Sequence, residues 1–287
     1  MHPEIWVAIP SNVLEDGSGL RAKTEKAGAI ARAAAIFGIQ RIYLYNIRHT
    51  LNEAPLIELL LNYLVLPQYL RKKVYPIREE LRFAGQLPPL KIPSHQVPKS
   101  LALVNKGDIR EGIVIFRSGH ALVDVGLEMN IPLALSDTAR QSERVTVVIT
   151  SGPPKISSRV VERNEIGQYW GYEVIKEESL KAIVSRSRPT SVLLTSRRGT
   201  PLREIWMDII EKVSNDGKFL VIFGSPRFGL FEVLAGENLK PTDIGAFAVN
   251  LFPDQNVETV RSEEAILAGL GILNFLRTVG DQRVSAK

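Results

Sequence analysis

The stretch Phe219–Leu230, FLVIFGSPRFGL, joins a continuous apolar run to a glycine-rich turn. The apolar residues Phe219–Phe223 are followed directly by turn residues, which is typical of a strand buried on both faces of a parallel sheet. Gly224 and Gly229 allow the backbone of the following loop to approach a ligand closely. Because α/β proteins bind ligands at the carboxyl ends of their strands, we expect a binding site at this loop.

A second apolar run, Ile244–Phe252, follows within about one crossover connection and ends in Asn250-Leu251-Phe252-Pro253. An unbroken run of this kind also indicates a strand of a parallel sheet. Parallel strands end at the same edge of a sheet, and ligands bind beyond that edge. We therefore interpret the two strand ends as parts of one site.

The start of the chain has a strand–helix–strand pattern. Ile5–Ile9 and Arg41–Tyr45 are short apolar runs, and Thr24–Phe37 is an alanine-rich segment with helical periodicity that Gly38 can terminate. This βαβ pattern predicts a mostly parallel sheet. The α/β pattern returns near Tyr169, so we predict one discontinuous α/β domain over residues 1–88 and 167–287.

The middle of the chain, residues 89–166, has a different composition. Four prolines in Leu87–Pro98 mark the boundary, and helical periodicity then gives way to short β-type runs: Ser100–Val104, Gly112–Phe116, Ala121–Val125, Arg144–Ile149 and Val160–Arg163. These runs predict an inserted small β-barrel of the OB type. Such barrels hold single-stranded nucleic acid through aromatic side chains, of which this segment has few. A spacer or a dimer contact is the alternative role.

The overall composition, with 45% apolar and 23% charged residues, is that of an ordinary globular protein. The absence of cysteine excludes disulfides, zinc–thiolate sites and thiol chemistry. The N-terminal segment has no signal-peptide pattern, and the longest apolar run is shorter than the roughly 20 residues that cross a bilayer. We therefore expect a cytoplasmic protein.

The net charge of +5 is unevenly distributed. Val184–Arg203 contains five arginines and no acidic residue, and Arg71-Lys72-Lys73 is a second basic cluster. Basic clusters favour a phosphate-containing partner such as RNA, and a basic surface without a polyanionic ligand is the alternative. The candidate RNA-binding residues are Arg21, Arg71, Lys72, Lys73, Arg197 and Arg227.

Five segments, in order, resemble the SPOUT superfamily of RNA methyltransferases, and most closely an archaeal and eukaryotic subgroup with an OB-fold insertion. Three of them resemble the superfamily's motifs: Lys26–Arg32 with Ala34–Gly38, then Phe223–Leu230, then Asn250–Pro253 with Thr259–Ala265. The other two support the subgroup: Pro67–Lys72 and Tyr169–Tyr172. The resemblance covers essentially the whole chain.

This resemblance implies an α/β fold with a C-terminal trefoil knot, a bound S-adenosylmethionine and an obligate homodimer. It implies an RNA methyltransferase that acts on rRNA or tRNA. A non-catalytic RNA-binding or assembly factor with the same fold is the alternative. Methyl transfer needs no metal, and the four histidines, His2, His49, His95 and His120, show no ligand spacing. The glycine-rich loop lacks the Gly-Lys-Ser/Thr ending of a P-loop.

The resemblance also indicates the residues that hold the cofactor: Thr195, Ser196, Arg198, Gly199, Gly224, Ser225, Pro226, Gly229, Asn250, Leu251, Phe252, Thr259 and Val260. Simpler roles are open for several of them. The two loop glycines can belong to an ordinary turn, and Asn250 can cap backbone instead of contacting adenine. Arg198 can hold RNA phosphate or lie in solvent. Leu251 and Phe252 can belong to the core.

Arg32 is the first catalytic candidate, because 2′-O-methylating relatives have a functional arginine at this motif position. Lys26 stands where those relatives have asparagine, and Pro226 stands where an acidic residue is usual. These departures argue against ribose chemistry. Glu263 is the second candidate, as a general base that disposes of a proton. A surface ion pair for Arg32 and a helix-dipole role for Glu263 are the alternatives.

Overall fold

The computed structural model describes residues 4–47, 50, 53–98, 100–134, 140–215 and 217–285. The chain divides into two compact units. One, the sheet unit, comprises Met1–Asn62, Glu80–Pro88 and Tyr172–Lys287. The other, the barrel unit, comprises Tyr63–Glu79 and Pro89–Gly171. The exact domain boundaries predicted above stay a prediction.

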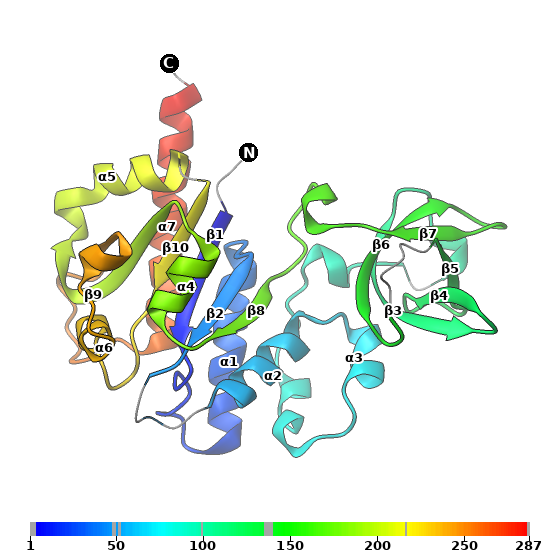
Figure 1. Ribbon diagram of the computed structural model, residues 1–287, viewed down its shortest axis with the longest axis horizontal. Coiled ribbons are helices and arrows are strands. Elements are labelled where there is room, and N and C mark those ends of the chain that lie inside the picture. Colours follow the sequence, from blue (N-terminus) through cyan, green and yellow to red (C-terminus); the bar gives the residue numbers. More distant parts are fainter. Residues whose placement is uncertain are drawn as a thin grey trace. The chain divides into compact units, whose positions relative to one another are not determined.

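The sheet unit contains a six-stranded parallel sheet in the order β11-β9-β10-β1-β2-β8 (Figure 1). Its strands are β1 (Glu4–Pro10), β2 (Arg41–Tyr45), β8 (Glu173–Glu177), β9 (Ser191–Pro201), β10 (Lys218–Ile222) and β11 (Ala246–Asn250). Each hydrogen-bonded pair in this sheet is parallel. In β10, Phe219–Ile222 are completely buried, as their unbroken apolar run predicts.

Helices cover the sheet on two faces. They are α1 (Gly19–Ile36), α2 (Ala54–Val65), α4 (Leu180–Ser187), α5 (Leu202–Asn215), α6 (Leu230–Gly236) and α7 (Ser262–Ser285). Apolar residues of α4 and α6 pack with Trp6, Tyr43 and Leu220 in one core cluster. The helices α1 and α7 lie against each other on the opposite face of the sheet (Figure 1). This arrangement is a parallel sheet between two helical layers.

The barrel unit contains a closed five-stranded barrel in the order β3-β4-β5-β7-β6. Its strands are β3 (Ile109–Arg117), β4 (His120–Asp124), β5 (Ile131–Ala134), β6 (Arg144–Ser151) and β7 (Ser157–Val160), and the unit also contains α3 (Gln68–Val74). Alternating residues such as Val114, Val123 and Val147 fill the interior. A Cβ on Gly112 would lie 2.3 Å from Val123 Cγ2, so the interior accepts no side chain there.

The predicted barrel is confirmed, but two of its expected strands are corrected. Residues Leu101–Leu103 form a 3₁₀ turn instead of a strand within Ser100–Val104. Leucine and alanine favour helical turns, and this turn places Val104 in the barrel core. The prediction missed β5 because this strand is short and contains Pro132, which usually argues against a strand. The assignment to the OB type stays a prediction.

The strand expected within Val160–Arg163 is also corrected: β7 ends at Val160, and a 3₁₀ turn covers Arg163–Glu165. Across the described residues, no helix is long and apolar enough to span a membrane.

Candidate functional site

The three neighbouring strands β9, β10 and β11 end at one edge of the sheet, and the residues that follow them line a cavity of about 680 Å³. We call it the strand-end cavity. Its walls come from three segments of the sheet unit: Thr195–Arg198, Phe223–Leu230 with Glu232, and Asn250–Phe252 with Gln255, Thr259, Val260, Ser262 and Ala265. The fold therefore brings together segments that lie far apart in sequence.

All but one of the residues expected to hold the cofactor line this cavity. The exception is Gly199, which does not line the cavity but permits the close approach of two strands beside it. A Cβ at this position would lie 2.6 Å from both the nitrogen and the carbonyl carbon of Val249, so β9 can approach β11 only with glycine here. Gly199 is therefore required by backbone packing.

The segment Thr195–Gly199 is an excursion within β9. Leu194 pairs with Ala248, but the next pair in β11, Val249, lies opposite Thr200. The five residues between leave the ladder and project into the cavity wall. Thr195 Oγ1 donates a hydrogen bond of 3.0 Å to the carbonyl oxygen of Ile222, which connects the excursion to the end of β10.

The glycine-rich loop is organised by two side chains. Ser225 Oγ accepts hydrogen bonds from the backbone N–H groups of Arg227, at 3.1 Å, and Phe228, at 2.8 Å. Glu232 Oε2 accepts from the N–H of Gly229, at 2.7 Å, and Glu232 Oε1 accepts from Arg198 Nη2, also at 2.7 Å. Side chains thus already hold several donors of this loop, and Arg198 joins it to the β9 excursion.

The amide of Asn250 connects the third wall to the first. Its Nδ2 donates to the carbonyl oxygen of Arg197 at 3.2 Å, and its Oδ1 accepts from the N–H of Phe252 at 3.0 Å. Leu251 and Phe223 are buried beside it and form an apolar part of the wall. Asn250 therefore lines the cavity and ties backbone at the same time.

Tyr45 holds the backbone of Phe223, a residue that lines the cavity. Its hydroxyl donates a hydrogen bond of 2.7 Å to the carbonyl oxygen of Phe223, the first residue after β10. Complete burial raises the pKa of Tyr45 well above its usual value, and the carboxylate of Glu237 adds to this. The hydroxyl consequently remains a donor over the whole physiological pH range.

The two catalytic candidates lie in different places. Glu263 is in the first turn of α7, beside the strand-end cavity residue Ser262. Arg32 is a partly exposed residue of α1 and does not line this cavity. The structure therefore brings Glu263, and not Arg32, next to the cavity.

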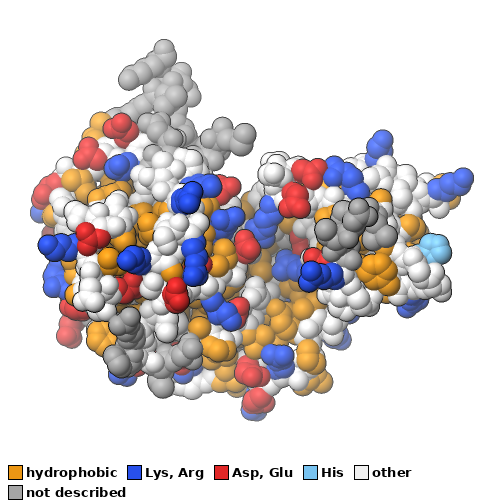
Figure 2. Space-filling view, viewed as in Figure 1, with side chains coloured by type: hydrophobic (Ala, Val, Ile, Leu, Met, Phe, Trp, Pro, Cys, Tyr) orange, Lys and Arg blue, Asp and Glu red, His pale blue; other side chains and the backbone are white. Residues whose placement is uncertain are grey.

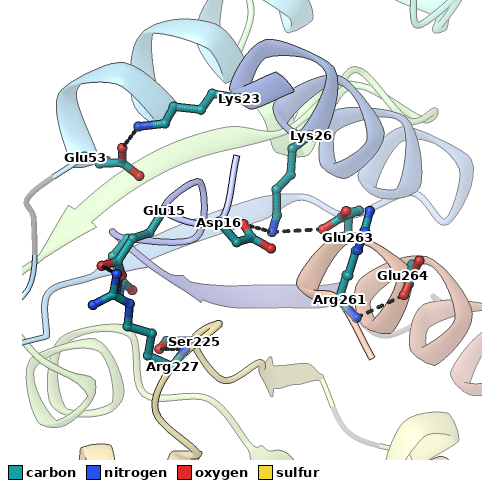
Figure 3. Close-up of polar contacts among 11 residues, drawn as sticks. Glu15, Asp16, Lys23, Lys26, Glu53, Ser225, Arg227, Arg261, Glu263 and Glu264 are labelled. Atoms are coloured by element: carbon teal, nitrogen blue, oxygen red, sulfur yellow. Dashed lines mark hydrogen bonds and ion pairs between the residues drawn. The ribbon is translucent and has the colours of Figure 1, made fainter. Parts of the chain in front are cut away.

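A neighbouring cluster was missed by the sequence reasoning, because its members come from segments that only the folded chain brings together. Lys26 is 6% exposed, and its Nζ lies 2.5 Å from Asp16 Oδ1 and 3.0 Å from Glu263 Oε2 (Figure 3). Glu15, 7% exposed, pairs with Arg227 at 2.9 Å and accepts a hydrogen bond from the buried Asn12. These ion pairs connect the loop after β1 to both the glycine-rich loop and α7.

The start of α7 is closed by a contact within its first turn. Ser262 is the first helical residue, and the backbone N–H of Arg261 donates to Glu264 Oε2 at 3.0 Å. Arg261 therefore occupies the capping position, and the carboxylate of Glu264 satisfies it as in a capping box.

The six candidate RNA-binding residues are divided between the two units. Arg21 pairs with Glu25, and Arg197 donates to the carbonyl oxygen of Glu258. In the barrel unit, Arg71 donates to the carbonyl oxygens of Leu64 and Leu66, and Lys73 pairs with Asp124, while Lys72 is exposed. Figure 2 shows Lys and Arg side chains interspersed with Asp and Glu on the visible face of the molecule.

Among the residues with a described placement, no group of three or more His, Asp or Glu side chains could hold a metal ion. His2 and His49 lie outside the described residues. His95 is partly buried and contacts the carbonyl oxygen of Val65 through Nε2, and His120 is exposed on the barrel.

A parallel sheet between helical layers, with a cavity beyond its strand ends that is lined by both polar and apolar residues, is the architecture of the ligand-binding α/β proteins. The chain belongs to the family described as "Putative RNA methyltransferase", whose profile matches residues 4–273. The prediction of an RNA methyltransferase is thereby confirmed. Such an enzyme requires a methyl donor and an RNA substrate.

Several relatives are similar over most of this chain. An uncharacterized protein of Halobacterium salinarum is 32% identical over 287 aligned residues, which cover 94% of this chain and 98% of that protein. The 28S rRNA (uridine-N(3))-methyltransferase of Homo sapiens is 29% identical, and the alignment covers 93% of this chain and 77% of that protein. The Drosophila melanogaster protein of the same name is 28% identical, with coverage of 93% and 61%.

Proposed function

We propose that this protein is an S-adenosylmethionine-dependent methyltransferase that modifies a uridine base of ribosomal RNA. The strand-end cavity carries the proposal, because it collects residues from all three segments that resemble cofactor-binding motifs. The substrate is suggested by the relatives named as 28S rRNA (uridine-N(3))-methyltransferases. A tRNA substrate, also expected from the sequence, is the second candidate.

The cavity suits a cofactor of this kind in size and chemistry. Its volume of about 680 Å³ lies within the usual range for small-molecule sites. Phe223 and Leu251 offer an apolar wall for a planar adenine, and Thr195 and Asn250 offer polar groups beside it. The sulfonium of S-adenosylmethionine supplies the electrophilic methyl group, so the protein has to orient a nucleophile in line and remove its proton.

We also propose the finer architecture that the resemblance implies, a trefoil-knotted C-terminal segment and a homodimer. Exposed apolar side chains of α1 and α7 support the dimer: Ile36 is 54% exposed, Leu267 is 46% exposed and Phe275 is 64% exposed. Apolar residues that gather on adjoining helices commonly mark a protein interface. The cytoplasmic location stays a prediction.

Calorimetric titration with S-adenosylmethionine and with its demethylated product tests the cofactor site. We expect micromolar binding to the native protein and at least a tenfold loss in Asn250→Ala, which removes both amide bonds in the wall. Asn164→Ala, an exposed barrel residue, is the matched control and should bind normally.

The outcome separates the enzyme from the non-catalytic alternative. A folded native protein that binds neither compound, with or without RNA, would contradict the proposal and favour an RNA-binding factor. Transfer of a tritiated methyl group to ribosomal RNA, followed by nucleoside analysis, then identifies the modified base. A product other than methylated uridine would contradict the proposed substrate.

A further inference from the structure

A second cavity, of about 500 Å³, lies between the loop after β1, the first half of α1 and the start of α7. We call it the α1–α7 cavity. Its polar lining includes Asp16, Glu25, Lys26, Arg261 and Glu263. Unlike the strand-end cavity, it has no aromatic residue in its lining, and its carboxylates outnumber its cations.

The two cavities share a wall. Thr259, Val260 and Ser262 line the strand-end cavity, while Arg261 and Glu263, from the same short segment, line the α1–α7 cavity. A second connection comes from Arg227, which lines the strand-end cavity and pairs with Glu15, the neighbour of Asp16. A molecule in one cavity would therefore lie beside a molecule in the other.

The charges of the α1–α7 cavity are unusual for a purely structural contact. Lys26 is almost completely buried, and its one ammonium group serves two carboxylates, Asp16 and Glu263. Glu263 Oε2 is a buried atom that accepts no hydrogen bond in the described part of the chain, although Lys26 Nζ lies 3.0 Å away. Burying such groups costs free energy, and a buried ion pair is weak evidence of a gain in stability.

We propose that the α1–α7 cavity holds the base of the target nucleotide by its imide edge, an inference that rests on the proposed function. The Watson–Crick edge of uracil presents an acceptor, the N3–H donor and a second acceptor. The cavity offers the complementary set, because Asp16 and Glu263 can accept from N3–H while Lys26 and Arg261 can donate to the two carbonyl oxygens. Cytosine has an acceptor instead of a donor at N3, so its N3 lone pair would face a carboxylate and be repelled.

The same groups account for the proton and the negative charge that methyl transfer to N3 involves. A carboxylate takes the N3 proton, and the cations stabilise the negative charge that spreads to the two carbonyl oxygens of uracil. The N3 lone pair then forms the new bond to the methyl carbon, and the carbon–sulfur bond breaks with its electrons on sulfur. The products are the N3-methylated base, the thioether and a proton that leaves through the carboxylate to solvent.

Fluorescence anisotropy of the full chain with labelled pentanucleotides tests the proposal. The probes are five uridines, five cytidines and five 3-methyluridines, each measured with and without the demethylated cofactor. We expect the uridine probe to bind about tenfold more tightly than the cytidine probe, since a good pair of base contacts discriminates to this degree. Because 3-methyluridine lacks the N3–H group, it should lose the preference without any change to the protein.

Two variants then assign the preference to this cavity. Asp16→Asn and Glu263→Gln keep the side-chain size but remove an acceptor charge, and each should reduce the uridine preference at least threefold. Glu258→Gln is the matched control, because Glu258 is an exposed carboxylate shortly before α7 that lines neither cavity. It should retain the preference.

Equal binding of the uridine and cytidine probes would overturn the inference, and so would an unchanged preference in both cavity variants. The cofactor titration distinguishes these results from a failure of the proposed function. If the native protein binds no cofactor but shows a uridine preference that these variants reduce, the base site stands and the methyltransferase proposal fails.

Discussion

The hydroxyl of Tyr45, at the end of β2, donates a hydrogen bond of 2.7 Å to the carbonyl oxygen of Phe223, at the end of β10. The two residues are 178 positions apart in the sequence, and both are buried. Together with the hydrogen bond from the N–H of Phe223 to the carbonyl oxygen of Ala8, this bond holds the first residue of the glycine-rich segment against the sheet. It therefore links the stability of the sheet to the shape of the strand-end cavity.

Tyr45→Phe should destabilise the protein by about 1–3 kcal/mol, because a buried carbonyl group loses its donor. Urea unfolding followed by circular dichroism measures the change. Tyr43→Phe is the control, since the hydroxyl of this buried neighbour makes only a 3.5 Å contact with Arg41. A larger loss in Tyr43→Phe than in Tyr45→Phe would contradict the assignment.

Gly199→Ala should both destabilise the protein and weaken cofactor binding. The added Cβ would lie 2.6 Å from backbone atoms of Val249, so β9 and β11 must separate, at a cost of about 1–3 kcal/mol. Gly236→Ala is the control, because a Cβ there meets no atom within 4 Å. Denaturant unfolding and the calorimetric titration measure the two effects, and equal results for both variants would refute the close approach.

Lys26→Met should cost about 1–3 kcal/mol of stability, because the partly buried Glu263 and the more exposed Asp16 lose the ammonium group between them. Adding Glu263→Gln should recover part of the loss, since one carboxylate charge is then removed. Arg21→Met, which breaks the exposed pair with Glu25, should cost less. A double variant no more stable than Lys26→Met would argue against a shared charge cluster.

Stability should decrease as the pH falls from about 7.5 to 5.5, in part because of His95. Burial lowers the pKa of His95, outweighing its contact with the carbonyl oxygen of Val65. The unfolded chain therefore binds a proton that the folded chain excludes, which favours unfolding below the ordinary histidine pKa of about 6.5. His95→Gln should flatten the pH dependence of the melting temperature, whereas the exposed-residue control His120→Gln should leave it steep.

Phe275→Glu should convert the proposed dimer into a monomer. Phe275 is 64% exposed on α7, and a charge placed in an apolar interface would remain without a partner. Light scattering coupled to size-exclusion chromatography measures the mass. Phe116→Glu, at a less exposed phenylalanine of the barrel, is the control. A native protein that is monomeric over the micromolar range would contradict the dimer.

The sequence alone was sufficient for the parallel sheet, the barrel and the walls of the strand-end cavity. The reason is local: a short unbroken apolar run bounded by turn residues, such as Phe219–Phe223, is typical of a doubly buried strand, and strand ends in such sheets collect at one edge. The segments around Gly224 and Asn250 also resemble superfamily motifs directly in sequence. The sequence did not predict β5, because Pro132 locally argues against a strand. In the folded chain, pairing of β5 with β4 and β7 outweighs that local signal.

The tertiary structure decided what depends on packing between distant segments. No sequence pattern indicates that Lys26 lies between Asp16 and Glu263, because an ion pair across 237 positions between Lys26 and Glu263 exists only once α1 and α7 are packed together. The same holds for Gly199, whose requirement arises from the backbone of β11 and not from its own turn. Arg71 looks like an RNA contact in sequence, but in the folded chain nearby backbone carbonyls take its guanidinium hydrogen bonds.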